Sequence, residues 1–191
     1  MSEMVNHVDE NDQELGVVSR AEAHRDGLLH RAVHVLAQDR QGRWILQQRS
    51  TSRTMNPGLW TSTCSGHVDP GEAYEDAALR EAREELGLEI HKLLPVSTLL
   101  LEATNSTAGE RCRAFTRVFV VGEFIDADAL RPNEETEGFH GMGTGEIAEL
   151  IHTPLLREDD AGAAIRFADN FPPVFSAVFN HSKTCLQFLH G

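Results

Sequence analysis

Apolar residues gather in short runs separated by turn residues in much of the chain. The runs at 28–37 and 43–48 have the length and apolar content of strands, and the polar segment 39–42 between them is typical of a turn. We therefore predict a hairpin there. Two further strands are predicted at 96–103 and 114–121. This pattern favours a sheet as the centre of the fold.

One segment shows helical periodicity most clearly. Within 72–86, Ala78, Ala82 and Leu86 recur every four residues, which places them on one face of a helix. Gly87 follows directly and is a common helix terminator, because glycine readily adopts the left-handed conformation found at helix ends. The sequence therefore predicts a helix over 72–86.

The last third of the chain is less regular. Residues 131–145 are rich in glycine and acidic side chains and predict a loop, whereas 146–152 predicts a short strand. Pro172 is suited to the first turn of a final helix, in which Phe175 and Phe179 share a face. The predicted elements follow in the order strands, a central helix, more strands and a final helix. This order predicts the α/β class, with a mixed sheet covered by helices on both faces.

Length and charge restrict the possible domain organisation and partners. A chain of 191 residues suits one domain, which we place at 28–191, with 1–27 as an N-terminal segment packing on it. The formal net charge is -13, so nucleic acid and anionic membranes are not expected partners. Phosphorylated small molecules remain compatible with this charge, because bound cations can reverse the local sign.

The cysteines and the absence of targeting patterns indicate a compartment. Cys64, Cys112 and Cys185 are odd in number and widely spaced, so a disulfide framework is not expected. The first residues are polar and acidic, unlike a signal peptide, and are expected to be loosely held. No apolar run approaches the ~20 residues that span a bilayer. We therefore expect a cytoplasmic protein.

Three carboxylates of the predicted helix carry the main chemical signal. Glu81, Glu84 and Glu85 are spaced i, i+3 and i+4, so they emerge on one side of the helix. Unpaired like charges there are destabilising, and a hard divalent cation with oxygen ligands relieves the repulsion. Such a cation also neutralises phosphate charge and activates water. Arg80 is placed to pair with a neighbouring glutamate and to orient it.

The segment 66–88, GHVDPGEAYEDAALREAREELGL, resembles the Nudix box at every fixed position. At about 5% usage each, its seven fixed residues would match by chance on the order of once in a billion windows. The resemblance implies a Nudix fold, an α/β/α sandwich, and Mg²⁺-dependent hydrolysis of a diphosphate linkage in a small molecule, with Mn²⁺ as a substitute ion. It also implies Glu84 and Glu85 as main metal ligands, Glu81 as ligand or base, and the Gly66 carbonyl as a further ligand.

Further site residues are expected outside the box. In the family that the box resembles, another acidic residue often enters from a late segment, and GEIAELIHTP resembles that region. The candidates are Glu146 as a metal ligand and Glu149 as a catalytic residue, and the sequence leaves open which one acts. Arg49 and Arg53 could meet substrate phosphate, with a solvated surface role as the alternative. His67 adjoins the first box glycine and is a candidate for substrate binding.

The N-terminal half resembles one branch of the family. The runs AEAHRDGLLHRAVHV, ILQQRS and PGLWTSTCSGHV are similar to isopentenyl-diphosphate isomerases and to Nudix hydrolases related to them. In those isomerases three histidines help to hold a metal, and the best matches here are His24, His30 and His67. A purely structural role for these histidines is the alternative.

The resemblance to the isomerases breaks at the residues that isomerisation needs. The isomerases carry a cysteine directly before the Gly-His pair, where this chain has Ser65, and Cys64 one position earlier faces the other side of a strand. Where they carry a strand glutamate, this chain has Cys112, Arg113 and Ala114. Isomerisation requires a placed acid and base. The sequence therefore favours hydrolysis and predicts a buried, unreactive thiol at Cys64.

Three alternatives remain beside the hydrolase. The first is an isopentenyl-diphosphate isomerase on the same fold. The second is a catalytically silent Nudix domain that binds a nucleotide, although the complete set of box glutamates disfavours it. The third is a role on nucleic acid such as cap removal, which the acidic composition disfavours. The sequence identifies neither the substrate nor the choice between a monomer and a homodimer.

Overall fold

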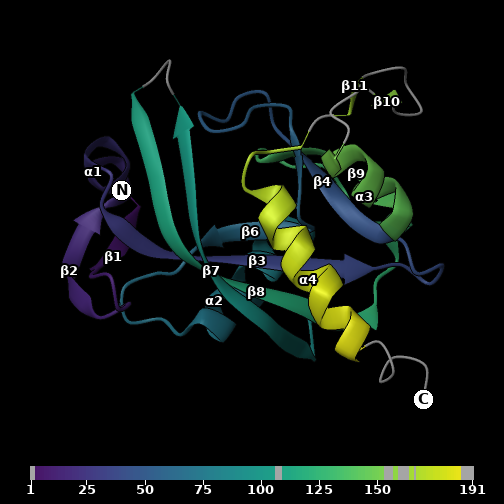
Figure 1. The fold of residues 1–191 in the computed structure, drawn as a ribbon, viewed down its shortest axis with the longest axis horizontal. Helices are drawn as coiled ribbons and strands as arrows, with labels where there is room; N and C mark the ends of the chain where they lie inside the picture. Colours follow the sequence, from purple (N-terminus) through teal and green to yellow (C-terminus); the bar gives the residue numbers. More distant parts are fainter. Residues whose placement is uncertain (1–2, 106–108, 153–156, 159–163, 166, 186–191) are drawn as a thin grey trace.

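The computed structural model describes residues 3–105, 109–152, 157–158, 164–165 and 167–185 (Figure 1). Its helices and strands follow one another in this order: β1 (Met4–Val8), β2 (Glu14–Ser19), α1 (Arg20–Asp26), β3 (Leu29–Gln38), β4 (Trp44–Arg49), β5 (Trp60–Thr61), β6 (Cys64–His67), α2 (Tyr74–Leu86), β7 (Leu93–Asn105), β8 (Glu110–Phe124), η1 (Ala127–Ala129), β9 (Thr136–Met142), α3 (Thr144–His152), β10 (Arg157–Glu158), β11 (Ala164–Ile165) and α4 (Phe171–Cys185).

A mixed sheet forms the centre of the molecule, as the sequence predicts. Its main path runs β5-β4-β3-β8-β7, while β6 pairs with β3 and β9 pairs with β4. Among the described strand pairs, β3 and β8 alone run parallel, with His34 opposite Val118. The pairing of β3 with β4 is antiparallel, which confirms the predicted hairpin. Because β3 pairs with β4, β6 and β8, it positions residues from distant parts of the chain around itself.

Helices cover both faces of this sheet. The first core cluster packs α2 against one face, and it includes Ala78 and Ala82 from the predicted helical stripe. The second cluster packs α4 and α3 against the other face, with Phe171 and Ile147 fully buried. Figure 1 shows α4 lying across the sheet in front of β3 and β8. The predicted arrangement of a sheet between helical layers is therefore confirmed.

The alternating directions of the side chains along β3 explain how this one strand contributes apolar residues to the cores on both faces of the sheet. Val33, Val35 and Ala37 belong to the α2 cluster, whereas Leu36 belongs to the α4 cluster. Successive side chains of a strand point to opposite faces, so one strand serves both cores. This explains why apolar residues stand side by side at Val35, Leu36 and Ala37 rather than alternating with polar ones.

Three predictions of local structure are wrong. The segment 146–152 belongs to the helix α3 and not to a strand, because its apolar residues Ile147, Leu150 and Ile151 share a helical face against the α4 cluster. The segment 131–145, expected as a loop, contains the strand β9. The N-terminal residues, expected to be loosely held, form the β1–β2 hairpin, in which Val5 and Val8 are fully buried.

Among the described residues, none of the helices combines the length and the apolar composition that a bilayer crossing requires.

Candidate functional site

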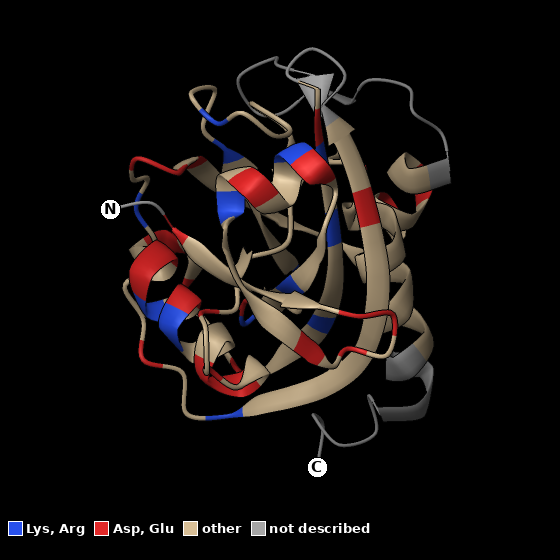
Figure 2. Cartoon of the chain, turned by 90° about the vertical axis from the view of Figure 1, so that its left-hand side faces the viewer, with Lys and Arg blue, Asp and Glu red and all other residues tan. Residues whose placement is uncertain are grey.

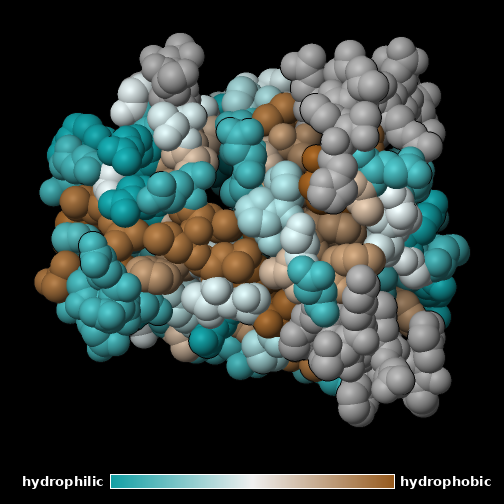
Figure 3. Space-filling model, in the orientation of Figure 1, coloured by the Kyte–Doolittle hydropathy of each residue, from teal (hydrophilic) through white to brown (hydrophobic). Residues whose placement is uncertain are grey.

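A cavity of about 510 Å³ opens between α2, the adjoining end of the sheet and the N-terminal segment. Two loops border it, and they carry Arg53 and Glu135. Figure 3 shows a hollow in the molecular surface with hydrophilic residues along its rim, next to an apolar area that runs from β1 and β2 toward β3 and β7. The cavity brings together the acidic helix and several of the arginines and histidines named from the sequence.

The carboxylates of α2 form one wall of the cavity. Glu81 and Glu85 are 9% and 7% exposed, whereas Glu84 projects toward solvent with 60% of its side chain exposed. Burial raises the pKa of Glu85 to about 8, with Glu81 and Glu135 adding to the effect. Burial also raises the pKa of Glu81 to about 7, against the influence of Arg80. Buried, mutually repelling carboxylates of this kind fit a hard divalent cation, whose charge would favour the ionised forms.

Gly66 is required where β6 passes beneath the helix. A Cβ atom at this position would overlap the carboxylate of Glu81, so no larger residue fits without displacing that side chain. The absence of a side chain lets the glutamate lie directly against the strand backbone. The Gly66 carbonyl, predicted as a metal ligand, therefore belongs to the same small region as the predicted glutamate ligands.

Arg80 connects the acidic wall to the turn that precedes the helix. Its guanidinium donates to Glu72 at 2.9 and 3.0 Å, to Glu81 at 2.7 Å and to the His67 carbonyl at 2.8 Å. A weaker contact reaches Glu84 at 3.3 Å. Arg80 is thus held by fixed partners on several sides, which suits it to orient Glu81 rather than to meet a substrate.

Three residues outside the predicted site support Glu85, two directly and one through Gln47. The Gln47 amide donates to a Glu85 carboxylate oxygen at 3.0 Å, and Thr136 donates to Gln47 at 2.5 Å. The Asn133 side chain donates to the Glu85 main-chain carbonyl at 2.9 Å. These partners come from β4, β9 and the preceding loop. Because they are far from the box in sequence and have no characteristic spacing, no sequence signal identifies them.

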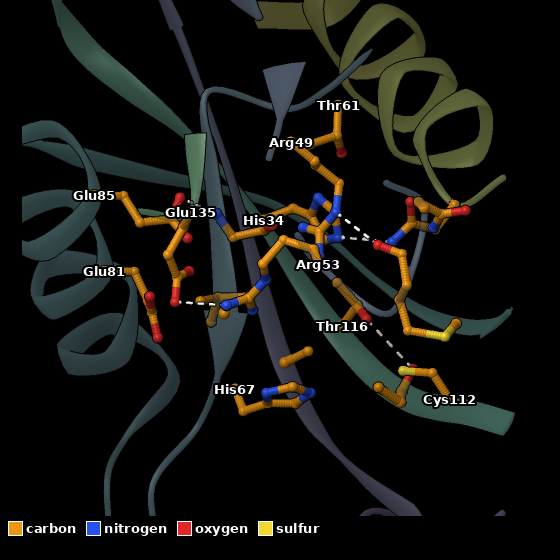
Figure 4. Close-up of a pocket in the computed structure, with 18 of the residues that line it drawn as sticks. His34, Arg49, Arg53, Thr61, His67, Glu81, Glu85, Cys112, Thr116 and Glu135 are labelled. Carbon is orange, nitrogen blue, oxygen red and sulfur yellow. Dashed lines mark hydrogen bonds and ion pairs between the residues drawn. The ribbon is translucent and has the colours of Figure 1, made fainter. Parts of the chain in front are cut away.

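Arginines face the acidic wall across the cavity. Arg49, Arg53 and Arg20 all line it, and the first two are the predicted phosphate contacts. The Arg49 side chain donates to the Met55 carbonyl at 3.1 Å, and burial together with the nearby Arg53 lowers its pKa. Figure 4 shows Arg49 and Arg53 pointing toward the space in front of Glu81 and Glu85. A phosphate group between these walls would meet both arginines and any cation held by the carboxylates.

A late glutamate does enter the site, but from another segment than the sequence suggests. Glu146 and Glu149 lie on α3 and are not among the residues that line the cavity. Glu146 accepts a hydrogen bond from the Gly143 amide at 2.9 Å. Glu135 lines the cavity instead, and it pairs with Arg53 at 2.7 Å. In the sequence, only the acidic composition of the loop that carries Glu135 points to a glutamate in this segment.

The three histidines named from the sequence meet at the end of the cavity toward α1. His24, His30 and His67 offer ring nitrogens that, together with the Cys112 sulfur, all lie within 4.8 Å of one another. His67 thus belongs to this cluster as well as to the cavity lining. Imidazole nitrogens and a thiol can together hold a transition metal, so the molecule has a second possible metal centre.

The residues at and beside the positions that isomerisation would need occupy distinct environments. Cys64 is fully buried in the core beneath α2, and burial raises its pKa well above the usual range, as expected for an unreactive thiol. Ser65 faces the cavity, as does Ala114. The position that would need a thiol therefore carries a hydroxyl group, and none of Cys112, Arg113 and Ala114 supplies the carboxylate.

Comparisons with known proteins agree with this geometry. A family model described as the NUDIX domain matches residues 28–162. A Streptomyces avermitilis protein named isopentenyl-diphosphate Delta-isomerase is 38% identical over 144 residues, which are 74% of this chain and 72% of that protein. A Streptomyces griseus protein of the same name is 39% identical over 148 residues, which are 76% of this chain and 74% of that protein.

Solved structures share the fold. The crystal structure of DR0079 from Deinococcus radiodurans has 25% sequence identity and a TM-score of 0.66, covering 92% of this chain and 99% of that one. The MutT protein from Methanosarcina mazei has 19% identity and a TM-score of 0.63, covering 81% of this chain and 96% of that one. At that identity the second likeness concerns the fold alone.

Proposed function

Because this chain belongs to the NUDIX domain family, we propose that it is a Mg²⁺-dependent hydrolase that cleaves a diphosphate linkage in a phosphorylated small molecule. The observation that carries the proposal is the cavity itself. Glu81, Glu84 and Glu85 face Arg49 and Arg53 across a space that suits a metal-bound diphosphate. A diphosphate is polyanionic, so it needs cations on both sides, and this arrangement provides them.

The carboxylates of α2 would hold the ion. Mg²⁺ would neutralise charge on the phosphate and lower the pKa of a bound water. Glu84 and Glu85 are proposed as its main ligands, with Glu81 as ligand or base and the Gly66 carbonyl completing the set. Without a metal, burial raises the pKa of Glu81 to about 7, and a bound Mg²⁺ would favour the ionised carboxylate, which could then accept a proton from water. Arg80 keeps the Glu81 carboxylate in place through its 2.7 Å hydrogen bond.

The arginines would hold the phosphate groups. Arg49 is partly buried and its pKa is lowered, so a phosphate oxygen would offset the cost of burying its charge. Arg53 is paired with Glu135, and a substrate phosphate would compete for the same guanidinium. We propose Arg20 as an additional phosphate contact, because it lines the cavity with its Nε atom buried and without a hydrogen-bond partner among the described residues.

Glu135 is the better candidate for the additional acidic residue. It lines the cavity, and its charge raises the pKa of both Glu81 and Glu85, which requires proximity to them. Glu146 and Glu149 lie on α3 outside the cavity lining, so the structure gives no support to their predicted roles. Substrate binding to Arg53 would release Glu135 to act on the metal or on water.

The second candidate is isomerisation of isopentenyl diphosphate, which the names of the two Streptomyces relatives favour. Proton addition and removal at carbon need an acid and a base on opposite faces of the substrate. Ser65 lines the cavity where the resemblance to the isomerases calls for a cysteine, and the segment Cys112, Arg113 and Ala114, which adds Cys112 and Ala114 to the lining, contains no glutamate. The cysteine and the glutamate that the isomerases use as acid and base are therefore both replaced, so hydrolysis has the stronger support.

Surface charge and domain boundaries fit a small substrate. Figure 2 shows acidic residues spread over helices and turns, with basic residues interspersed among them. This distribution favours a small anion held inside a cavity over a nucleic acid or an anionic membrane laid across the surface. We propose a domain at 28–191 with residues 1–27 packed on it. Glu3 and His24 from that segment line the cavity, so it belongs to the functional unit.

The first experiment is a screen for Mg²⁺-dependent release of phosphate or a monophosphate. The panel contains nucleotides, nucleotide sugars and isopentenyl diphosphate. Glu84→Gln and Glu85→Gln are compared with Glu75→Gln, an exposed glutamate of the same helix outside the cavity lining. Release that disappears in the first two variants and persists in the third supports the hydrolase. Deuterium uptake from solvent into isopentenyl diphosphate without phosphate release would support the isomerase instead.

A further inference from the structure

The cavity extends beyond the carboxylates of α2 to a polar side next to β5 and α4. We propose that Thr61, His34 and Asn170 form a subsite there, which binds the group attached to the diphosphate through hydrogen bonds. The subsite would take a group that carries O–H or N–H donors, and not a hydrocarbon chain. This inference rests on the proposed hydrolysis, and it concerns the part of the substrate that the acidic helix does not contact.

Three separate segments bring these residues together. Thr61 belongs to β5, His34 belongs to β3 and Asn170 directly precedes α4, and all three line the cavity. The Ala168 amide donates to the Trp60 carbonyl at 2.8 Å, which holds the segment before α4 against β5. Figure 4 shows Thr61 on the opposite side of His34 from the carboxylates of α2. A substrate whose diphosphate lies at the carboxylates would therefore extend its remaining group toward this subsite.

A chain of hydrogen bonds fixes the tautomer of His34. Burial lowers its pKa to about 3, with the charge of Arg49 adding to the effect, so the ring is neutral. The Ser62 hydroxyl donates to the Cys64 carbonyl at 3.1 Å, so the Ser62 oxygen accepts from Nδ1 of His34 at 2.7 Å. Nε2 of His34 therefore carries no hydrogen, and it accepts from the Asn170 amide nitrogen at 3.4 Å.

The tautomer of His34 determines what Asn170 offers to a ligand. Because the Asn170 amide nitrogen donates to His34, its Oδ1 atom occupies the other branch of the amide group. Oδ1 is buried and has no hydrogen-bond partner among the described residues. A buried acceptor without a donor costs free energy, and an O–H or N–H group of a ligand in the cavity would remove that cost.

Thr61 and Arg49 add further hydrogen-bonding groups. Thr61 is buried in the protein and lines the cavity, and its hydroxyl can both donate and accept. Arg49 also lines the cavity, and its Nε atom donates to the Met55 carbonyl at 3.1 Å. Its two terminal nitrogens supply additional donors. The subsite thus combines an acceptor at Asn170, a hydroxyl at Thr61 and a neighbouring guanidinium.

A hydrocarbon chain has no group that satisfies these polar atoms. If such a chain entered this side of the cavity, it would exclude water and leave the polar atoms unpaired. For this reason, a site built to hydrogen-bond a substrate discriminates against an analogue that lacks the bonding group. The native protein should therefore bind a diphosphate with a polar group more tightly than one with a hydrocarbon group.

The test measures binding without turnover. The probes are methylene-bridged analogues of diphosphates, which resist cleavage at the bridge, and they carry a nucleoside, a sugar or an isopentenyl group. Titration calorimetry in Mg²⁺ gives the affinity of the native protein for each probe. We expect the best polar probe to bind about tenfold or more tightly than the isopentenyl probe. The ratio of these two affinities is the quantity that the variants should change.

Three variants test the subsite against one matched control. Asn170→Leu keeps the approximate size of the side chain and removes both polar atoms, so it should lower the affinity ratio about tenfold. Asp169→Ala changes the exposed neighbour outside the cavity lining and should keep the ratio. His34→Phe removes the acceptor that positions Asn170 and should lower the ratio. His34→Gln, whose amide oxygen can accept from Asn170, should restore part of it, whereas a merely structural role would weaken both probes alike.

The outcomes are distinguishable from those of the hydrolase screen. If no compound is hydrolysed, the proposed function fails, while calorimetry still measures the preference of the subsite. Native protein that binds no polar probe, or that binds the polar and isopentenyl probes equally, would overturn the subsite. An Asn170→Leu variant that keeps both a native melting curve and the native affinity ratio would overturn it as well. The native measurement decides the question even if a variant fails to fold.

Discussion

Glu85 offers a test of the acidic wall that needs no substrate. In metal-free protein its carboxylate is buried beside Glu81, and its pKa is raised from 4.5 to about 8. The native state therefore binds more protons at this position than the unfolded state does. Stability that is fully present below about pH 4.5 should be lost progressively as the pH rises through about 8. Replacing Glu85 by glutamine removes the ionisation and should abolish its share of this loss.

The magnitude follows from the size of the shift. One pKa unit corresponds to about 1.36 kcal/mol, so a shift from 4.5 to about 8 amounts to roughly 5 kcal/mol at most. We expect Glu85→Gln to change the free energy of unfolding little near pH 5 and to increase it by roughly 3 to 5 kcal/mol near pH 8.5. Each kcal/mol corresponds to about 2–4 °C in the melting temperature of a chain of this size.

The assay is urea denaturation of the native protein and the Glu85→Gln variant in chelator across this pH range. A parallel series in Mg²⁺ should stabilise the native protein increasingly as the pH rises, because the ion favours the charged carboxylates. The variant should gain less from Mg²⁺. A difference in stability between the two proteins that does not change with pH would refute the reasoning.

Three further predictions concern single residues. Gly66→Ala should displace the Glu81 carboxylate and reduce kcat by about 100-fold or more while the circular dichroism spectrum stays native. Arg53→Ala should raise the KM for the diphosphate substrate, yet change the melting temperature little, because its half-exposed pair with Glu135 contributes at most about 1 kcal/mol to stability. Phe171→Ala removes a fully buried ring and should lower the free energy of unfolding by about 3–5 kcal/mol in urea denaturation.

The sequence predicts the family, the Nudix fold and the main acidic helix, because each depends on local spacing. The period of Ala78, Ala82 and Leu86 and the terminator Gly87 locate the helix, and the structure begins it at Tyr74 rather than at Glu72. Strand predictions fail where the apolar pattern is short or absent, as at 146–152, at β9 and at the β1–β2 hairpin. Residues 146–152 contain an apolar run that fits either element, and packing against α4 selects the helix.

The rest of the site depends on contacts between distant segments. Glu135 and Gln47 are brought toward α2 by the pairing of β9 with β4, and Arg20 reaches the cavity because the N-terminal segment packs against β3 and β8. None of these residues has a spacing that relates it to the box. Sequence spacing also cannot show that Glu149 lies outside the cavity lining. The packing of α3 decides this, and it depends on contacts between distant segments.

The parallel pairing of β3 with β8 has a consequence for synthesis of the chain. Arg113, the first β8 partner of β3, comes 75 residues after Gln38, the last residue of β3. At roughly 5–20 residues per second, one side of β3 would wait about 4 to 15 s for its neighbour on the ribosome. This side belongs to an apolar strand, so the nascent chain is exposed to aggregation during that interval. Cellular yield should therefore depend on chaperones and on translation rate between β3 and β8, even for variants with native stability.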